Sequence, residues 1–128
     1  PVGSTTLARL SALGFARVVI SDGDRPVAVR EGDTALCQPV GPIAAPVDVT
    51  GAGDALAGAV IARWPAMALG EAVRLGVAAA AATIAVRDPF RADIAACDIA
   101  GMASALPAPT PLDADPAPIG EAHATDRS

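Results

Sequence analysis

Residues 48–58 read Asp-Val-Thr-Gly-Ala-Gly-Asp-Ala-Leu-Ala-Gly, and this stretch decides how the chain is interpreted. Its Gly-Ala-Gly turn leads directly into a run of small, apolar residues that favour a helix. Such a turn places backbone N–H groups at a helix N-terminus, where the positive end of the helix dipole attracts phosphate oxygens. Asp54 belongs to the same first turn, so a carboxylate stands beside the predicted anion-binding turn.

These residues predict a site suited to phosphoryl chemistry. The backbone N–H groups around Gly51, Ala52 and Gly53 would stabilise negative charge on a transferred phosphoryl group. Asp54 would accept the proton of an attacking hydroxyl group as a general base. A structural interpretation exists too, because Gly-x-Gly commonly precedes a helix and the dipole alone favours an acidic residue there. The spacing by itself leaves both interpretations open.

Two other phosphate-binding loops fit this stretch poorly. A Walker A loop requires Gly-Lys-Ser or Gly-Lys-Thr, and the chain contains no Lys. A dinucleotide-binding turn requires Gly or Ala at its sixth position, which is Leu56 when counted from Gly51. It also requires its glycines to follow a short strand directly, whereas Pro46 lies close to this turn.

Composition limits the classes of function. The 128 residues suffice for one small domain with a modest core. A net charge of −5 argues against a nucleic-acid surface. Cys37, Cys97 and His123 lack the spacing of a zinc site. No segment resembles a signal peptide, and the apolar run 75–86 is too short to span a membrane. We therefore expect a cytoplasmic protein.

Hydrophobic periodicity and turn residues predict seven helices and strands. Ser4 or Thr5 is the expected N-cap of the first helix. From Pro107 onward Pro, Ala and Asp dominate, which predicts a disordered tail over 107–128. The predicted helices span 4–13, 54–64, 69–86 and 94–106, and the predicted strands span 17–21, 27–30 and 34–40.

The order of these elements indicates the α/β class. The β-branched run 18–20 is typical of a buried strand, with neighbours on both sides and helices on both faces of its sheet. The chain supplies only part of those neighbours.

Residues 48–58 resemble the C-terminal signature of the ribokinase-like (PfkB) carbohydrate and nucleoside kinases, roughly Asp-Thr-Thr-Gly-Ala-Gly-Asp-Ala/Ser-Phe-x-Gly. Two flanking segments agree in order. Residues 19–26 take the place of the family's strand ending in Thr-x-Gly-x-x-Gly, and residues 71–80 resemble its next helix. The resemblance covers about residues 1–106. The chain departs from the family at Val49, Pro26 and Val77, where Thr, Gly and a polar residue are usual.

The resemblance implies a fold and an activity. The fold would be part of a three-layer α/β/α sandwich, namely the C-terminal part of its central sheet with flanking helices. The activity would be ATP-dependent phosphorylation of a sugar or nucleoside hydroxyl group, with Mg²⁺ as a cofactor. The partner would then be a small-molecule substrate, with neither nucleic acid nor membrane involved.

The resemblance also implies roles for individual residues. Asp54 would be the catalytic base and Ser21 and Gly23 would lie near the nucleotide. Members that use a monovalent cation such as K⁺ hold it with groups at the positions of Asp48 and the Thr50 carbonyl. The anion hole that receives the ATP phosphates would consist of Gly51, Ala52 and Gly53.

The family's N-terminal half is the main feature that the chain lacks. That half carries a sugar-binding Gly-Gly region, lid strands and an Asn-x-x-Glu element that organises Mg²⁺, and this chain contains no Asn. We interpret the chain as a C-terminal fragment or a truncated product. The alternative is a catalytically inactive remnant or interaction module, whose uncovered strand 18–20 would associate with a second copy or with the missing half.

Two further alternatives concern the ligand. A dinucleotide-binding fragment is a third option, which Leu56 disfavours. Among kinase substrates, residues 47–56 and the Ala92-Asp93-Ile94 segment resemble bacterial pseudouridine kinases. Ribose-type sugars and other nucleosides stay open, because the residues that bind the sugar are absent.

Overall fold

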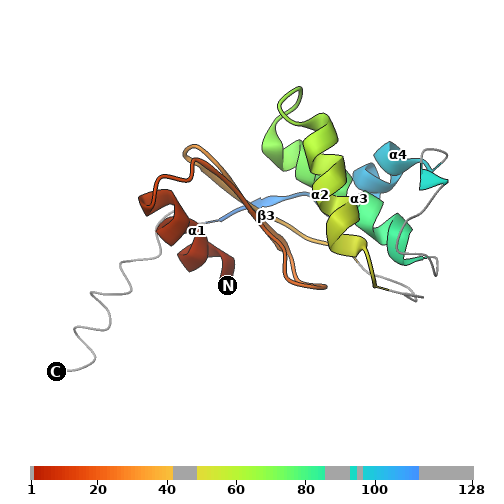
Figure 1. Ribbon diagram of the computed structural model, residues 1–128, viewed down its shortest axis with the longest axis horizontal. Coiled ribbons are helices and arrows are strands. Elements are labelled where there is room, and N and C mark those ends of the chain that lie inside the picture. Colours follow the sequence, from red (N-terminus) through yellow and green to blue (C-terminus); the bar gives the residue numbers. More distant parts are fainter. Residues whose placement is uncertain (1, 42–48, 86–92, 95–96, 113–128) are drawn as a thin grey trace.

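The computed structural model describes residues 2–41, 49–85, 93–94 and 97–112. A β-sheet lies between helix α1 (Val2–Ala12) on one face and a group of three helices on the other (Figure 1). This arrangement confirms the α/β class and a partial three-layer sandwich. The three helices are α2 (Ala52–Arg63), α3 (Leu69–Ile84) and α4 (Ile99–Ala105).

The described sheet has the order β1-β2-β3-β4, and all its neighbours are antiparallel. Its strands are β1 (Arg17–Ile20), β2 (Val27–Glu31), β3 (Thr34–Gln38) and β4 (Thr110–Pro111). Gly32, with a φ of +60°, forms the tight turn between β2 and β3. Within the described residues β1 is an edge strand and is only half-buried, because β-branched residues indicate packing on both faces and not the number of neighbouring strands.

Alternation along the strands divides the core between the two faces of the sheet. Val27 and Val29 of β2 face the three-helix side, and Ala28 between them faces α1. On the α1 side a small cluster gathers around Leu7. The larger cluster consists of Val27, Val29, Leu56, Leu69, Val73 and Val77.

Helices α2 and α3 pack closely because Gly76 of α3 has no side chain. A Cβ at Gly76 would lie 3.0 Å from the Leu56 carbonyl oxygen of α2. The Ala-rich stretch that follows Gly76 is almost wholly buried, including Ala78, Ala79 and Ala82. Small residues therefore let two backbones approach each other here.

Three predicted helix starts differ from the observed ones, and for α2 the difference is only that it begins at Ala52 and not at residue 54. Helix α1 begins at Val2, so Ser4 and Thr5 lie within the helix and the prediction of an N-cap at either was wrong. Helix α4 begins at Ile99 and not at residue 94, because Asp98 is its N-cap. The Asp98 Oδ1 accepts a hydrogen bond from the Gly101 N–H at 2.9 Å.

The segment after α4 also differs from the prediction of a disordered tail beginning at Pro107. Thr110 and Pro111 form β4, which pairs with Cys37 and Leu36 of β3. The Leu112 N–H donates to the Ala35 carbonyl at 2.9 Å. Prolines can end a helix and still occupy an edge strand, which composition alone did not reveal. Residues 113–128 lie outside the described part of the chain.

Candidate functional site

The turn before α2 gives this helix an N-terminus without a side-chain cap. The N-cap residue is Gly51, whose φ of +83° and ψ of −3° fall in the left-handed region that glycine adopts without strain. The Ala52 N–H bonds to the Val49 carbonyl at 3.3 Å, and the Ala55 N–H bonds to the Gly51 carbonyl at 2.9 Å. The first turn of a helix has N–H groups without helical acceptors, so this end suits a bound anion.

Gly53, in the first turn of α2, has no packing reason to be glycine. A Cβ at this position would meet no atom within 4 Å. Glycine inside a helix is about 1 kcal/mol less favourable than alanine. A ligand that approaches the bare backbone is a physical reason for glycine at this position.

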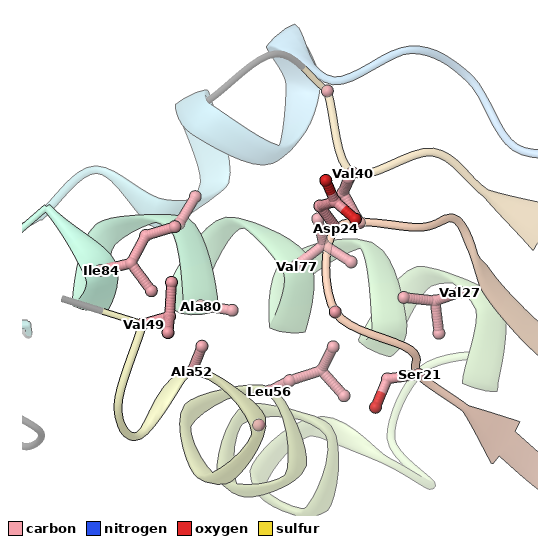
Figure 2. Close-up of a pocket in the computed structure, with 14 residues that line it drawn as sticks. Ser21, Asp24, Val27, Val40, Val49, Ala52, Leu56, Val77, Ala80 and Ile84 are labelled. Carbon is pink, nitrogen blue, oxygen red and sulfur yellow. The ribbon is translucent and has the colours of Figure 1, made fainter. Parts of the chain in front are cut away.

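A cavity of about 690 Å³ borders this helix start (Figure 2). Its volume falls in the range of small-molecule sites, about 300–1,000 Å³. In Figure 2, α2 contributes one side, α3 contributes another, and the loops after β1 and β3 close the site. The lining residues from α2 and α3 are Ala52, Gly53, Leu56, Val77, Ala80, Ala81 and Ile84, and those from the loops and strand ends are Ser21, Gly23, Asp24, Val27, Val40, Gly41 and Val49.

The structure brings together four of the residues that the sequence singled out. Ser21 follows β1 directly, and Gly23 occupies the next turn with a φ of +57°. Both line the cavity together with Ala52 and Gly53 of α2. Thr50 and Gly51 belong to the turn before α2 and are not among the lining residues, and Asp48 lies outside the described residues.

Asp54 lies beside the cavity and does not line it. It follows Gly53 in the first turn of α2 and is exposed. Successive residues of an α-helix are rotated by about 100°, which turns the Asp54 side chain toward an adjoining face. The cavity and the predicted base Asp54 therefore lie on two adjoining sides of the same helix start. A phosphoryl group at this helix N-terminus would be accessible both from the cavity and from the side of Asp54.

The cavity is largely apolar and contains no basic side chain among its lining residues. Asp24 is their charged member, and Ser21 contributes a hydroxyl group. The neighbouring acid, Asp22, pairs with Arg25 at 3.7 Å. An anion in this cavity would therefore depend on backbone N–H groups and the dipole of α2 for its binding.

Of the cavity-lining residues on α3, the sequence singled out Val77, as a departure from the family pattern, and missed the others. Val77, Ala80 and Ile84 recur at helical spacing and share one face of α3. That periodicity was present in the sequence, but the helix is apolar almost all round, so the spacing did not separate a ligand-facing stripe from the core. Val40 and Gly41 carry no sequence signal for a pocket.

The N-terminus of α3 is occupied by a side chain of the protein itself. Glu31, at the end of β2, accepts a hydrogen bond from the Leu69 N–H at 3.0 Å. Its second oxygen accepts one from the Trp64 Nε1–H at 3.1 Å and lies 3.6 Å from the Arg17 Nε. The Arg17 guanidinium lies 5.2 Å from the centroid of the Trp64 ring.

These donors stabilise the charged form of Glu31. The Leu69 N–H contributes most, followed by the Trp64 N–H, and together they hold the pKa of Glu31 below its ordinary value of 4.5. Arg17 acts in the same direction, and desolvation opposes these effects. The Glu31 carboxylate thus takes the place that an anion would take at an open helix end.

Metal-binding and membrane-spanning features are absent from the residues that the structure describes. In that part of the chain no three His, Cys, Asp or Glu residues gather in a group able to hold a metal ion. No helix there is long and apolar enough to cross a membrane.

The sequence profile of the pfkB carbohydrate kinases matches residues 4–90, which is more than half of the chain. The chain belongs to the pfkB family of carbohydrate kinases. The match includes the turn before α2, the cavity-lining part of α3 and the loop after β1. No curated protein matches this pfkB family chain.

Solved structures share the fold of this pfkB family member. A protein from Clostridium perfringens classed as a sugar kinase superposes with a TM-score of 0.73 at 19% identity. A carbohydrate kinase from Agrobacterium tumefaciens superposes with a TM-score of 0.60 at 28% identity. These matches cover 85% and 80% of this chain. The chain spans about a third of the two solved structures, 35% and 34% respectively.

Proposed function

We propose that this chain forms the nucleotide-binding and base-bearing part of a kinase that transfers phosphate from ATP to a hydroxyl group of a sugar or nucleoside. The observation that carries the proposal is the juxtaposition at the start of α2. Gly53 exposes bare backbone in a cavity wide enough for a nucleotide, and Asp54 follows on the adjoining face. Membership of the pfkB family supports the reaction class.

The volume and the lining residues of the cavity support a nucleotide as its ligand. The base would pack between the apolar walls that Val77 and Ala80 of α3 help to form. The phosphates would extend toward Ala52 and Gly53, where backbone N–H groups and the α2 dipole favour negative charge. Their charge has to be stabilised this way because no basic side chain lines the cavity in the described residues.

The proposed reaction is a direct displacement at the γ-phosphorus of ATP. The substrate hydroxyl oxygen forms the new P–O bond, the bond to the β–γ bridging oxygen breaks, and ADP leaves with the electron pair. Asp54 accepts the hydroxyl proton as the oxygen attacks. The N–H groups at the start of α2 stabilise the charge that spreads over the phosphoryl oxygens.

The proposed reaction includes metal ions that would act on the charge of the phosphates. Bound Mg²⁺ neutralises part of the phosphate charge. We propose Asp48 and the Thr50 carbonyl as ligands of a monovalent cation such as K⁺, because the chain resembles cation-dependent family members at these positions. Thr50 lies next to Gly51, the N-cap of α2, so a cation there would lie close to the proposed anion hole.

The replacement of Asp54 by Asn tests the assignment of the base. Asn keeps the size of the side chain and cannot accept the proton. In the full-length protein we expect kcat for phosphorylation of the sugar or nucleoside to fall by about 10²–10⁴-fold. ATP affinity, measured by calorimetry, should change little, because Asp54 does not line the cavity.

Asp33→Asn is the matched control, because Asp33 is an exposed residue of the turn between β2 and β3. It should leave kcat unchanged. A normal kcat in Asp54→Asn would overturn the role of the base. ATP binding without phosphorylation of any sugar or nucleoside by the wild-type protein would instead support an inactive binding or interaction module.

A further inference from the structure

The segment that begins in the last turn of α4 is attached to the sheet and to α3 at several points. We refer to residues 104–112 as the C-terminal strap. It leaves α4, passes the end of β3 and then pairs with that strand as β4. Leu106 packs against the large core cluster on the three-helix side, and Leu112 packs against the small cluster around Leu7. The strap therefore contacts the cores on both faces of the sheet.

Gln38 anchors the strap from the last residue of β3. Its side chain is buried, with only 1% of its surface exposed. The Nε2 group donates to the Pro107 carbonyl at 3.1 Å and to the Pro39 carbonyl at 2.9 Å. The Oε1 atom is buried and has no hydrogen-bond partner among the described residues. The two hydrogen bonds that the amide nitrogen donates therefore hold the Gln38 side chain in place, and one of the two acceptors belongs to the strap.

Arg74 anchors the same segment from α3. Its Nη2 donates to the Leu106 carbonyl at 2.7 Å and lies 3.5 Å from the Ser104 carbonyl. These carbonyls lie at the C-terminal end of α4. Backbone carbonyls at this end of a helix have no helical N–H partner. A charged donor at such a position makes a strong hydrogen bond. Gln38 and Arg74 together engage three carbonyl groups between residues 104 and 107.

The anchored strap supports one wall of the cavity. Val40 and Gly41, which directly follow Gln38 and Pro39, line the cavity, and no strap residue does. A Cβ at Gly41 would lie 3.0 Å from the Leu106 Cδ2, so Leu106 lies directly behind this wall. Gly41 has a φ of +75°, a backbone conformation that side-chain-bearing residues rarely adopt. The position of Gly41 is therefore set by its own backbone and by Leu106 behind it.

We infer that Gln38 and Arg74 are positioning residues for nucleotide binding, which act by holding the C-terminal strap against the Val40–Gly41 wall of the cavity. The inference rests on the proposed function, because it takes the cavity to be the nucleotide site. Neither residue touches the nucleotide. Their effect passes through Leu106 to Gly41, and it changes how well the cavity binds ATP and not how fast the phosphoryl group is transferred.

The first test removes the donors. Gln38→Met keeps the length and burial of the side chain and eliminates the unpaired Oε1, so a folded variant is expected. Arg74→Met removes the guanidinium in the same way. In the full-length protein each should weaken ATP binding by about five- to tenfold, the size of one or two lost hydrogen bonds. The KM for ATP should rise in parallel, while kcat stays within about twofold.

Matched controls separate this effect from general damage. Arg9→Met removes an exposed arginine from α1, on the other face of the sheet. Ser104→Ala changes a strap side chain and keeps the backbone carbonyl near Arg74. Both should retain wild-type ATP affinity. Because Gln38 and Arg74 anchor one segment, the double variant should lose less affinity than the product of the two single losses.

The second test does not depend on any variant. If the strap supports the cavity, ATP must in turn stabilise the strap, because coupling between two sites is reciprocal. Hydrogen exchange of the wild-type protein should slow at residues 104–112, including the Leu112 N–H, when ATP is added. Slower exchange is also expected in α3 and at the start of α2, which line the cavity.

The outcomes distinguish this inference from the proposed function. The absence of any ATP binding to the wild-type protein would overturn the proposed function and the inference together. ATP protection of α3 without protection of residues 104–112, together with wild-type ATP affinity in Gln38→Met and Arg74→Met, would overturn the inference alone. A lower kcat at unchanged KM in both variants would also contradict it.

Discussion

The N-termini of α2 and α3 differ in whether a side chain of the protein accepts hydrogen bonds from their unpaired N–H groups. Both helices begin with N–H groups that have no helical acceptor. At α3 the Glu31 carboxylate, from a neighbouring strand, accepts a hydrogen bond from the Leu69 N–H. At α2 the N-cap residue is Gly51, which has no side chain to offer, and the next turn borders a cavity. The start of α3 is closed by a side chain of the protein, and the start of α2 is open toward the cavity.

This difference supports the proposal that the start of α2 is the functional one. Acidic residues occur in the first turn of both helices, Asp54 in α2 and Glu71 in α3, so a sequence motif of an acid after a turn does not distinguish them. The distinction lies in the long-range contact from Glu31. Within the described residues no side chain caps the start of α2, so its N–H groups can bind an anion.

The largest expected effect comes from closing the open end. Gly53→Asp gives the start of α2 a carboxylate of its own, in the place proposed for the ATP phosphates. Like charges a few ångströms apart repel strongly in a partly buried site. We expect ATP affinity, measured by calorimetry on the full-length protein, to fall by about 100-fold, roughly 2.7 kcal/mol. The melting temperature should not fall, because an acid in the first helical turn is favoured by the dipole.

Gly58→Asp is the control for this experiment. It adds the same side chain to the same helix at an exposed position outside the cavity, where a Cβ meets no atom within 4 Å. ATP affinity should be unchanged. Equal losses of affinity in the two variants would show that the open helix end is not the phosphate site.

An intermediate effect is expected when the start of α3 loses the Glu31 carboxylate that closes it. Glu31→Gln removes the charge that the Leu69 and Trp64 N–H groups stabilise. We expect the free energy of unfolding at pH 7 to decrease by about 1–2 kcal/mol, as for hydrogen bonds to a charged group that is partly exposed. Urea denaturation measures this difference.

The same variant makes a prediction about pH. A carboxyl group whose pKa is lowered in the folded state adds stability above its unfolded pKa and loses that contribution as the pH falls through the folded value. The gap in stability between wild type and Glu31→Gln should therefore close below about pH 4.5. Glu71→Gln, an exposed acid at the same helix start, should show no comparable gap at pH 7. A gap that does not narrow as the pH falls below 4.5 would contradict the role of the charge.

The smallest effect is expected from Trp64→Phe. Phe keeps an aromatic ring next to Arg17 and removes the N–H that Trp64 donates to Glu31. The loss of this one hydrogen bond should cost about 0.5–1.5 kcal/mol in the free energy of unfolding. The pKa of Glu31, followed by carbon NMR titration, should rise toward its ordinary value and stay below it, because the Leu69 N–H remains. An unchanged pKa would show that the Trp64 N–H does not contribute to the shift.

The sequence predicted local features of the site better than distant ones. Ala52 and Gly53 follow from the Gly-Ala-Gly turn, and Ser21 and Gly23 follow from the family pattern after the first strand. The closure of α3 by Glu31 was not predicted, because its partner Leu69 lies far along the chain and only folding brings them together. The apolar cavity wall on α3 was hidden for another reason, since a helix buried on most sides shows no distinct stripe.

The fold shows the same division. Periodicity and turn residues predicted seven of the elements to within a few residues, because their patterns are local. The β4 strand was missed, since two residues in a Pro-rich segment form a strand only because β3 offers an edge to pair with. The start of α4 depended on Asp98 as an N-cap, and the preceding Ile94 was a plausible earlier start by hydrophobicity alone.

Gly76 has a consequence for the dimensions of the cavity. The contact between this residue and the Leu56 carbonyl joins the backbones of α2 and α3, which carry Leu56 on one side of the cavity and Val77 on another. Side-chain rotamers can adjust by ångströms, whereas two touching backbones cannot come closer. The distance between these two walls is therefore fixed by how closely the two helices pack. A ligand wider than this distance has to be accommodated by the loops that carry Ser21 and Val40.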